Sequence, residues 1–516
     1  MNIVTKKRKL SKCFAAIAVS AAAAAAVTAA AFAEGGGIYD DGSGTGSGGG
    51  IYVADSETHS VGDFTVTGGT YETDYIYDSS GALAILTGTP LTIANTDPSV
   101  ETSDFICITS NVPANITLAG VNINATYCAL SVSDSADAVI TLADGSDNKL
   151  TSGEYVAGIQ KNFNKAELTI QCEGSGTDGH VCGSGCGKLT VNGGSSAAGI
   201  GGSNQIPTGR INISGGIINV TGGRGGSGIG GTQLFSNVSN ITVSGGVVTA
   251  KGGSENSFGI GGDYAYVSTC TGLKVTGGSV KSTFTVTPTD ESGNPVYPMI
   301  IPNPNGADVY IDGVKYSAAN HSALDGDTSL YAYLTKDEHT VTVGGIPVYL
   351  AEIPNSDGAD VYIDGVKYSA SANRSVYDSD TNLYVYLTGD DHAVTINEST
   401  KIYVFENSAF EEMNVYFAPE FGIIPTEDGM TWDGDTKTLT LDNATVATYS
   451  NTADVEKVDI FFLIPADTTI VCKGENAIRF NDHTDGLTGC SIKCKGNLTI
   501  VGESSVNDKL DANNSL

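Results

Sequence analysis

The chain has 516 residues, with 26 Lys and Arg against 58 Asp and Glu, and a formal net charge of −32. Phosphate binding needs clustered basic side chains, so this balance argues against nucleic acid and anionic membrane surfaces as partners. The length indicates several domains, and the acidic charge favours a soluble extracellular protein that Ca²⁺ could assist.

Residues 1–33 have the pattern of a secretory signal peptide. A basic run at 6–12 precedes an Ala-rich apolar stretch at 14–32, and Ala31-Phe32-Ala33 forms an A-x-A cleavage site. Cleavage there removes five basic residues, so the mature charge is 21 − 58 = −37. A retained membrane anchor is the alternative, but no other stretch is long and apolar enough to span a bilayer. We therefore predict an extracellular protein, secreted or associated with the cell surface, without a membrane span after cleavage.

Residues 34–60 form a predicted Gly/Ser-rich linker. Gly35-Gly36-Gly37-Ile38-Tyr39 recurs as Gly48-Gly49-Gly50-Ile51-Tyr52, with Gly, Ser and Asp between the copies. Such a composition buries little apolar surface and stays flexible.

Residues 61–286 carry a ladder of short segments, each with an apolar, a polar and an apolar residue. This alternation has the period of a β-strand, and the Gly pairs after several trios permit turns. The apolar pairs recur every 21 to 32 residues, at Phe64/Val66, Leu91/Ile93, Ile116/Leu118, Ile140/Leu142, Leu168/Ile170, Leu189/Val191, Ile211/Ile213, Ile241/Val243 and Leu273/Val275. A second row runs out of phase, and its last three members lie in Gly-Ile-Gly-Gly motifs: Ile85, Ile108, Leu130, Ile159, Ile200, Ile229 and Ile260.

The ladder predicts a right-handed parallel β-helix over 61–286. One short strand per repeat cannot bury its apolar face alone, so neighbouring repeats must stack. Leucine-rich repeats need a Leu/Asn consensus that the chain lacks, and a propeller blade needs four strands in about 40–50 residues. The ladder returns at Leu439, Ile470 and Leu498, which predicts a short second β-helix over 425–516. The predicted fold class is all-β.

The region between the two β-helices contains a tandem repeat of another kind. The segment Gly306–Ala318 recurs without change at Gly358–Ala370. Asp312-Gly313 and Asp364-Gly365 lie between alternating runs and are hairpin signals. We predict two small antiparallel β modules, at 287–346 and 347–410. They resemble the PEGA-type β modules of bacterial surface proteins.

The ladder also resembles a known family. The order S-x-x-G-I-G-G, followed by I-x-[IV]-S-G-G-x-[VI]-x-[AV]-x-G-G, is similar to that of secreted Firmicutes β-helix proteins described as carbohydrate-binding domain proteins. The resemblance covers about 61–286 and, less fully, 425–505. It implies an extracellular, non-catalytic role on polysaccharide, assisted by calcium. It assigns no binding residue, because the repeated residues are turn and core residues.

The two modules supply the candidate carbohydrate-binding residues. In an alternating strand, Tyr310 and Asp312 share the face opposite Val309 and Ile311. An outward ring offers a sugar an apolar platform, and carboxylates accept hydrogen bonds from hydroxyls. The alternative interpretation is cross-strand Tyr packing. The candidates are Tyr310, Asp312, Tyr331, Tyr333, Tyr362, Asp364, Tyr384 and Tyr386.

Two Asp-rich segments resemble the start of a calcium loop. They contain Asp325 with Asp327, and Asp378 with Asp380. Both lack the Gly and the distal Glu of an EF-hand loop, so the pattern favours a turn over Ca²⁺ binding. Ca²⁺ is nevertheless the cofactor that these residues suggest.

Cysteines offer a second set of candidate ligands. Cys182 and Cys186, with Cys172 and His180 nearby, have a spacing like that of metal ligands, although it matches no standard zinc finger. A local disulfide or core packing is the favoured interpretation, because an exported chain permits disulfides. Cys490 and Cys494 are interpreted in the same way, and Cys107 and Cys128 could stack between adjacent coils.

The sequence argues against an enzyme. A lyase needs a basic residue near carboxylates that hold calcium, and the mature chain has only Arg210, Arg224, Arg374 and Arg479 as arginines. The Gly-His-Gly and Arg-x-Lys signatures of β-helix polygalacturonases are absent, and so is a nucleophile elbow. We therefore expect a non-catalytic protein that binds polysaccharide or a host or cell-wall glycan, or that mediates adhesion. A β-helix lyase or hydrolase and a structural surface spacer are the alternatives.

Overall fold

The computed structural model describes residues 58–502, except 110–111, 134, 136, 164–165, 178–179, 233–236, 255–256, 263–269, 318–327, 356–358, 370–381, 398, 426–428, 448–459 and 480–490. Within these residues the regular structure is β, apart from the 3₁₀ helix η3 (Pro419–Phe421). No helix among them is long and apolar enough to cross a membrane. They form two compact units, one within 1–354 and 371–388 and the other within 355–370 and 389–516.

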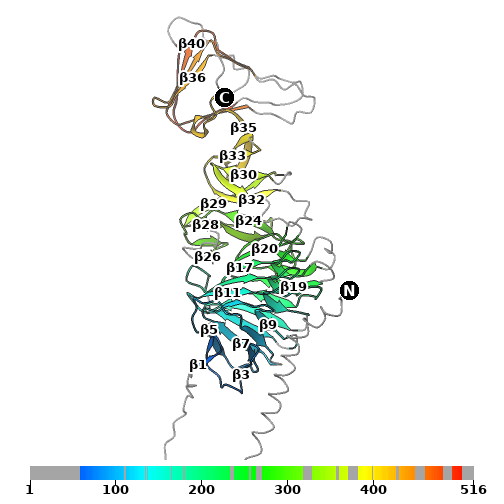
Figure 1. Cartoon of the computed structure of the whole chain (residues 1–516). Helices are drawn as coiled ribbons and strands as arrows, with labels where there is room; N and C mark the ends of the chain where they lie inside the picture. The colour runs from blue at the N-terminus through cyan, green and yellow to red at the C-terminus, as the bar shows by residue number, and fades with distance from the viewer. Residues whose placement is uncertain are drawn as a thin grey trace, which may run out of the picture. The chain divides into compact units, whose positions relative to one another are not determined.

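The first unit contains a parallel β-helix with three sheets, whose coils are stacked along the chain (Figure 1). Sheet 1 contains β1 (Thr58–Val61), β2 (Phe64–Thr67), β5 (Leu91–Asn95), β7 (Ala114–Leu118), β10 (Ala138–Leu142), β13 (Glu167–Cys172), β16 (Arg210–Ile213), β19 (Val238–Val243) and β22 (Cys270–Val275). Sheet 2 contains β8 (Asn122–Asn124), β11 (Asp147–Thr151), β14 (Lys188–Asn192), β17 (Ile217–Thr221), β20 (Val247–Lys251) and β23 (Ser279–Ser282). Sheet 3 contains β3 (Tyr75–Tyr77), β4 (Ala82–Ile85), β6 (Phe105–Ile108), β9 (Leu130–Val132), β12 (Ile159–Lys161), β15 (Ile200–Gly201), β18 (Ile229–Gly230) and β21 (Ile260–Gly261).

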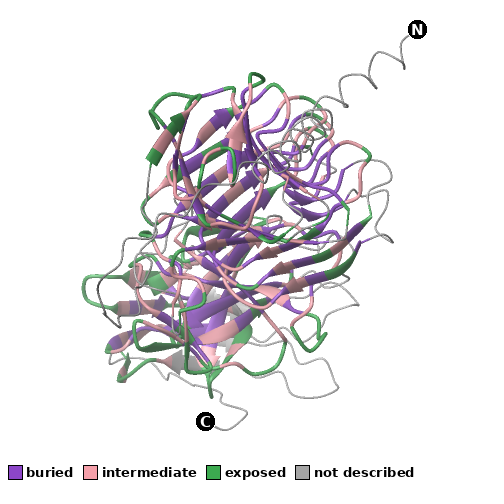
Figure 2. Cartoon of the chain, turned by 90° about the horizontal axis from the view of Figure 1, so that it is seen from below, coloured by how far each residue is buried: buried purple, intermediate pink, exposed green. Residues whose placement is uncertain are grey.

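The core of the β-helix consists of the predicted apolar rows. In sheet 1, Ile140 pairs with Ile116 and with Ile170 in parallel register, and all three side chains are buried. The intervening polar residues face outward, as the period of a strand requires. In sheet 3, the second row is continuous from Ile159 to Ile260. The strands of this unit are accordingly buried along much of their length (Figure 2).

One predicted rung of the ladder belongs to another sheet. Leu189 and Val191 lie in β14, on sheet 2, and β13 pairs directly with β16, so that Leu168 faces Ile211. The residues from 168 to 211 are therefore one long coil rather than two short ones. The reason is an extended corner at 173–187, which delays the second strand of that coil and gives it the spacing of a separate repeat.

The first strands of the unit are antiparallel. β1 pairs with β2, β2 with β5, and β3 with β4 in antiparallel register. The Phe64/Val66 rung is thus part of the end of the β-helix rather than a parallel coil. In a terminal coil without a neighbour, backbone N–H and C=O groups would be unpaired and could pair with another chain. The antiparallel strands form hydrogen bonds with these groups instead.

The Gly-Ile-Gly-Gly motifs place glycines where the coils touch. Gly201, Gly230 and Gly261 pair with one another across β15, β18 and β21. Their φ angles are 132°, 130° and 121°, a region that side chains rarely adopt. A Cβ on Gly230 would also meet the carbonyl oxygen of Gly261 well inside van der Waals contact. Only glycine fits both requirements.

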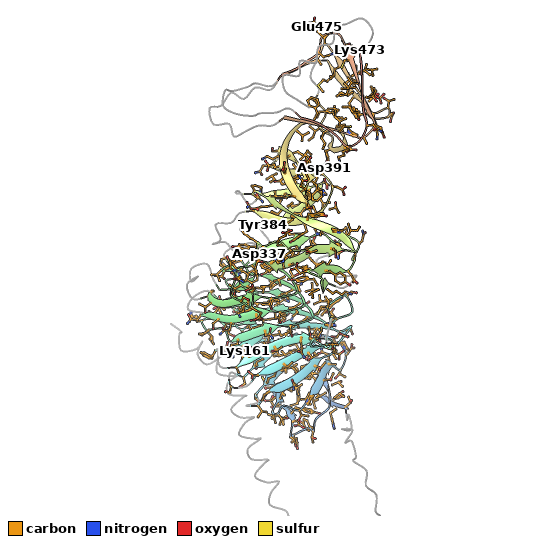
Figure 3. The ribbon with its side chains drawn as sticks, turned by 180° about the vertical axis from the view of Figure 1, so that it is seen from behind. Lys161, Asp337, Tyr384, Asp391, Lys473 and Glu475 are labelled. Atoms are coloured by element: carbon orange, nitrogen blue, oxygen red, sulfur yellow. The ribbon has the colours of Figure 1, made fainter. Side chains whose placement is uncertain are left out.

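A charged side chain lies within this β-helix. Lys161 of β12, labelled in Figure 3, is fully buried. Its Nζ donates a hydrogen bond to the carbonyl oxygen of Ser133 at 2.8 Å. A backbone acceptor at this distance offsets part of the desolvation cost of the ammonium group.

An antiparallel sheet follows the β-helix in the first unit. It contains, in spatial order, β26 (Val314–Ser317), β25 (Val309–Ile311), β28 (Val341–Val343), β29 (Ile346–Ile353), β32 (Leu383–Thr388), β24 (Tyr297–Ile301) and β27 (Leu330–Leu334). Its one parallel pair is β24 with β32. The two sequence repeats are therefore not two separate sheets with a boundary at 346/347, because β29 and β32 of the second repeat pair with β28 and β24 of the first.

The second unit contains the rest of the second repeat and a short stacked array. One sheet contains β31 (Val366–Ser369), β30 (Asp360–Ile363), β33 (His392–Ile396), β34 (Ser399–Glu406), β35 (Ala409–Phe417), β39 (Ile460–Ile464) and β42 (Ser491–Cys494). Another contains β36 (Met430–Asp433), β37 (Thr438–Asp442), β40 (Thr468–Lys473) and β43 (Leu498–Gly502), and a third pairs β38 (Thr445–Ala447) with β41 (Ala477–Arg479). Leu439 pairs with Ile470 in parallel, as predicted. The third strand is stacked on the second, but its register differs by two residues from the prediction, because Leu498 pairs with Thr468 and Ile500 with Ile470.

Candidate functional site

The two repeats present the same row of side chains on their β-sheets. Tyr310 of β25 pairs with Lys315 of β26 on one side and with Thr342 of β28 on the other. Tyr310 is exposed, at 37% of its residue surface. Val309 and Ile311, which flank it in the strand, are buried, so the alternation directs the tyrosine outward as the sequence predicts.

The second repeat reproduces this row in the other unit. Tyr362 of β30 pairs with Lys367 and Thr395, and 39% of its residue surface is exposed. Thr395 continues the row to Thr400, with 2.8 Å between the two hydroxyl oxygens. We call these two sets the tyrosine rows: Lys315, Tyr310 and Thr342 in the first repeat, and Lys367, Tyr362 and Thr395 in the second.

An ion pair borders each tyrosine row. Lys315 Nζ lies 2.9 Å from a carboxylate oxygen of Asp308, and Lys367 pairs with Asp360 in the same way. The hydrogen bond from each lysine to its aspartate raises the pKa of that lysine. Each row therefore offers a charged donor, a carboxylate acceptor and a hydroxyl around an exposed ring.

Asp312 and Asp364 have a structural role in the hairpins. Both occupy the first turn position with positive φ, 51° and 49°, which Asp tolerates better than most residues. Asp312 accepts hydrogen bonds from His339 Nδ1 at 2.8 Å and from the Thr340 N–H at 2.9 Å. Asp364 accepts the equivalent bonds from His392 and Ala393. Both carboxylate oxygens are thus occupied within the protein.

These hydrogen bonds set the protonation of the two carboxyls. Desolvation acts to raise the pKa of Asp312, but the bonds from His339 and Thr340 outweigh it and the pKa lies below its ordinary value. The same balance, with His392 and Ala393, lowers the pKa of Asp364. The role of these two residues as sugar acceptors stays a prediction.

Tyr331 and Tyr333 are buried, which corrects the prediction that they form an outward sugar-binding face. They lie in β27, which packs on the last strand of the β-helix. The Tyr331 N–H donates to Ser279 Oγ at 3.0 Å, and the ring of Tyr333 lies 5.3 Å from that of Phe284. Tyr333 belongs to the apolar core of the β-helix and covers its end, which would otherwise face water. The ring of Tyr331 lies beside Lys281, whose Nζ is 5.4 Å from the ring centroid.

Tyr384 and Tyr386 are also buried, because β32 is a central strand of the antiparallel sheet. Both belong to its core, together with Met299 and Leu330. Desolvation raises the pKa of Tyr386 to about 12. These rings are packing residues, as the alternative interpretation held. The calcium candidates Asp325, Asp327, Asp378 and Asp380 lie outside the described residues.

The structure brings together the Cys and His residues of 172–186. The Sγ atoms of Cys172, Cys182 and Cys186 and a ring nitrogen of His180 all lie within 4.8 Å of one another. The described cysteines are free thiols, so the local disulfide expected from the sequence is not formed. Hydrogen bonds from Cys182 and Cys186 lower the pKa of the Cys172 thiol.

Among the described residues, the other cysteines considered in the sequence do not form such a group. Cys107 pairs in register with Ser131 rather than with Cys128, whose Sγ lies 3.1 Å from the carbonyl oxygen of Leu130. Cys490 lies outside the described residues. Among the described residues, the Cys172–Cys186 group is the cluster with metal-ligand geometry.

Comparison of the chain with family models, with curated proteins and with solved structures gave no match. Function must therefore be argued from the residues themselves.

Proposed function

We propose that this chain is a non-catalytic extracellular protein that binds polysaccharide through its tyrosine rows. The observation that carries the proposal is the repetition of the exposed tyrosine. Tyr310 and Tyr362 occupy equivalent positions in two hairpins and lie in different compact units. Tyr331 and Tyr333 of the first repeat and Tyr384 and Tyr386 of the second are buried, so the outward tyrosine is a distinct position within the module.

The chemistry of each row suits a pyranose ring. The apolar C–H face of a sugar packs on an exposed aromatic ring, whereas its hydroxyls need donors and acceptors at the rim. Lys315 with Asp308, and Lys367 with Asp360, supply both. A lone exposed ring gives weak binding. Two copies in one chain raise the affinity for a polymer whose repeating units contact both.

The charge of the chain restricts the polysaccharide. A mature charge of −37 repels an acidic glycan, and salt screens this repulsion without adding attraction. Neutral glycans are therefore the ligands that the tyrosine rows favour. Binding of an acidic glycan would need a bridging cation, and Ca²⁺ is the ion that shared carboxylate oxygens select.

Glycan-array binding, confirmed by affinity electrophoresis, tests the proposal. The expected result is retention of the full chain by a neutral polysaccharide, unchanged by chelator. Replacement of Tyr310 and Tyr362 by Ala should abolish this retention, whereas replacement by Phe should preserve most of it because the ring remains. No new reducing or unsaturated ends should appear in the polysaccharide.

A control variant changes the same hairpins on their other face. Val314 and Val366 are 69% and 57% exposed and pair with the inward residues Ile311 and Ile363. Directly paired side chains share a face of the sheet, so Val314→Ala with Val366→Ala should leave retention unchanged. Failure of neutral and acidic glycans to bind, with or without Ca²⁺, would reject glycan binding and favour the spacer function.

A further inference from the structure

One corner of the β-helix differs from its counterparts. The chain passes from sheet 1 to sheet 2 through residues 119–121, 143–146, 214–216, 244–246 and 276–278 in the other coils. In the coil of β13 and β14 the same corner spans 173–187. Cys182, Cys186 and His180 all lie in this extended corner, and Cys172 is the last residue of β13. The extra residues and the clustered ligand types therefore coincide.

The separations of the four side chains match the edges of a small tetrahedron. Cys172 Sγ lies 3.1 Å from His180 Nε2 and 3.4 Å from Cys182 Sγ, and His180 Nε2 lies 3.7 Å from Cys182 Sγ and 3.8 Å from Cys186 Sγ. Zn–S bonds of about 2.3 Å and Zn–N bonds of about 2.0–2.1 Å in tetrahedral geometry give ligand separations of roughly 3.5–3.8 Å. Two of the four separations lie in this range, and the two between Cys172 and its neighbours are up to about 0.4 Å shorter. Small side-chain movements would therefore bring the four groups around one such ion.

The surroundings of the cluster are those of a closed metal site. Cys172, Cys182 and Cys186 are buried and pack with Ile217 and Val247, apolar residues at the start of β17 and β20. The Gly216 N–H donates a hydrogen bond to Cys182 Sγ at 3.2 Å. Such donors stabilise the negative charge of a ligating thiolate and fix its orientation.

Two further contacts orient the ligands. Ser175 Oγ lies 3.3 Å from Cys172 Sγ and accepts a hydrogen bond from the Cys172 N–H at 3.1 Å. The imidazole of His180 occupies the space next to Gly174, where a Cβ would overlap the ring. A side chain at position 174 would therefore displace the histidine from the three thiols.

We propose that Cys172, His180, Cys182 and Cys186 bind one Zn²⁺ in a structural site. Three soft sulfurs and an imidazole are the donor set of Cys₃His zinc sites. All four ligands come from the protein, which leaves no open position for a substrate. The mutual distances, all within 4.8 Å, suit one ion rather than an iron–sulfur cluster, whose irons and sulfides need wider ligand spacing.

The ion fastens the extended corner to the β-helix. It joins the end of β13 to the loop that precedes β14, and the loop then covers Ile217 and Val247. A single disulfide would use two of the three thiols and would give no role to His180. Zinc uses all four groups and also protects the thiolates from oxidation outside the cell.

Metal analysis of the full chain, expressed in zinc-supplemented medium, tests this proposal. The expected content is about one zinc ion per chain, the stoichiometry of a single tetrahedral site. Replacement of Zn²⁺ by Co²⁺ should give the intense visible absorption of tetrahedral cobalt and the near-ultraviolet bands of thiolate coordination. Titration with a mercurial reagent should release zinc in proportion to the thiols blocked.

Variants locate the site. Cys182→Ser and His180→Ala should each lose most of the zinc. Cys128→Ser and Cys270→Ser are the matched controls, since both remove a buried thiol outside the cluster, and they should keep it. If Cys182→Ser does not fold, the zinc content of the His180→Ala variant tests the site. His180 is less deeply buried than the thiols, so its replacement should disturb the fold less. A metal-free chain with a disulfide among Cys172, Cys182 and Cys186 would overturn the proposal, as would iron in place of zinc.

Discussion

Ile213 of β16 pairs with Val243 of β19 in parallel register, and both side chains are fully buried. They stack in the core of the β-helix between neighbouring coils. Replacing both with Asp should unfold this part of the β-helix, because each unpaired buried carboxylate costs several kcal/mol. Calorimetry and far-ultraviolet circular dichroism should show loss of the main unfolding transition.

The adjacent pair provides a matched control for this prediction. Asn212 faces Thr242 in the same two strands, with side chains on the outer face. Asn212→Asp with Thr242→Asp adds the same two charges to the same strands. This variant should retain the transition, although two like charges opposite each other lower its midpoint slightly. An equal loss in both variants would contradict the assignment of Ile213 and Val243 to the core.

Replacement of Gly230 by Ala should destabilise the β-helix more than replacement of an ordinary turn glycine by Ala. Its φ of 130° is unfavourable for Ala, and the new Cβ would collide with the backbone of Gly261 in the next coil. Gly293→Ala is the control, since Gly293 has a φ of 87° but open space around it. Thermal unfolding of the two variants should separate steric overlap from backbone strain alone. Equal thermal midpoints for the Gly230 and Gly293 variants would show that contact with the next coil does not require glycine at position 230.

Much of the β-helix follows from its sequence, because each apolar row, apart from Leu189 and Val191, maps onto one sheet of stacked strands. Ile116, Ile140 and Ile170 show this for the first sheet. The spacing of the apolar pairs could not assign Leu189 to its sheet, because a long corner loop before β14 gives it the spacing of a new coil. The antiparallel pairing of Phe64 was likewise hidden, because a strand has the same alternation in either direction.

The candidate sites were predictable only in part. Alternation correctly directed Tyr310 and Tyr362 outward. It could not reveal that Tyr331 and Tyr333 pack on the end of the β-helix, because that contact joins strands with no local signal in common. The Cys and His spacing matched no standard motif. The four side chains come together because the corner between β13 and β14 folds back onto the end of β13. A corner longer than its counterparts was the available signal.

The tyrosines of the repeats should divide into two groups by their effect on stability. Tyr333→Ala or Tyr384→Ala removes a buried ring and should cost about 3 kcal/mol or more. Tyr310→Ala or Tyr362→Ala, on the outward face, should change stability by less than about 0.5 kcal/mol. Differential scanning calorimetry of the four variants checks this division. A large loss of stability from the Tyr310 or Tyr362 variant would indicate a packing role and would weaken the glycan-binding proposal.

Acid should weaken the hairpin turns of both repeats. The pKa values of Asp312 and Asp364 are lowered in the folded protein, so their stabilising effect is complete above the unfolded pKa of about 3.9 and is lost as pH falls through the folded values. Both carboxylates are about half exposed, so solvent screening limits each contribution to at most about 1 kcal/mol. Asn tolerates positive φ and can still accept the backbone N–H bond, which makes Asp312→Asn with Asp364→Asn the conservative variant. Thermal midpoints of the wild type and this variant should differ at pH 7 and converge as the pH falls through the lowered folded pKa values. A gap that stays constant over this range would assign the difference to the shape of the turn rather than to the charge.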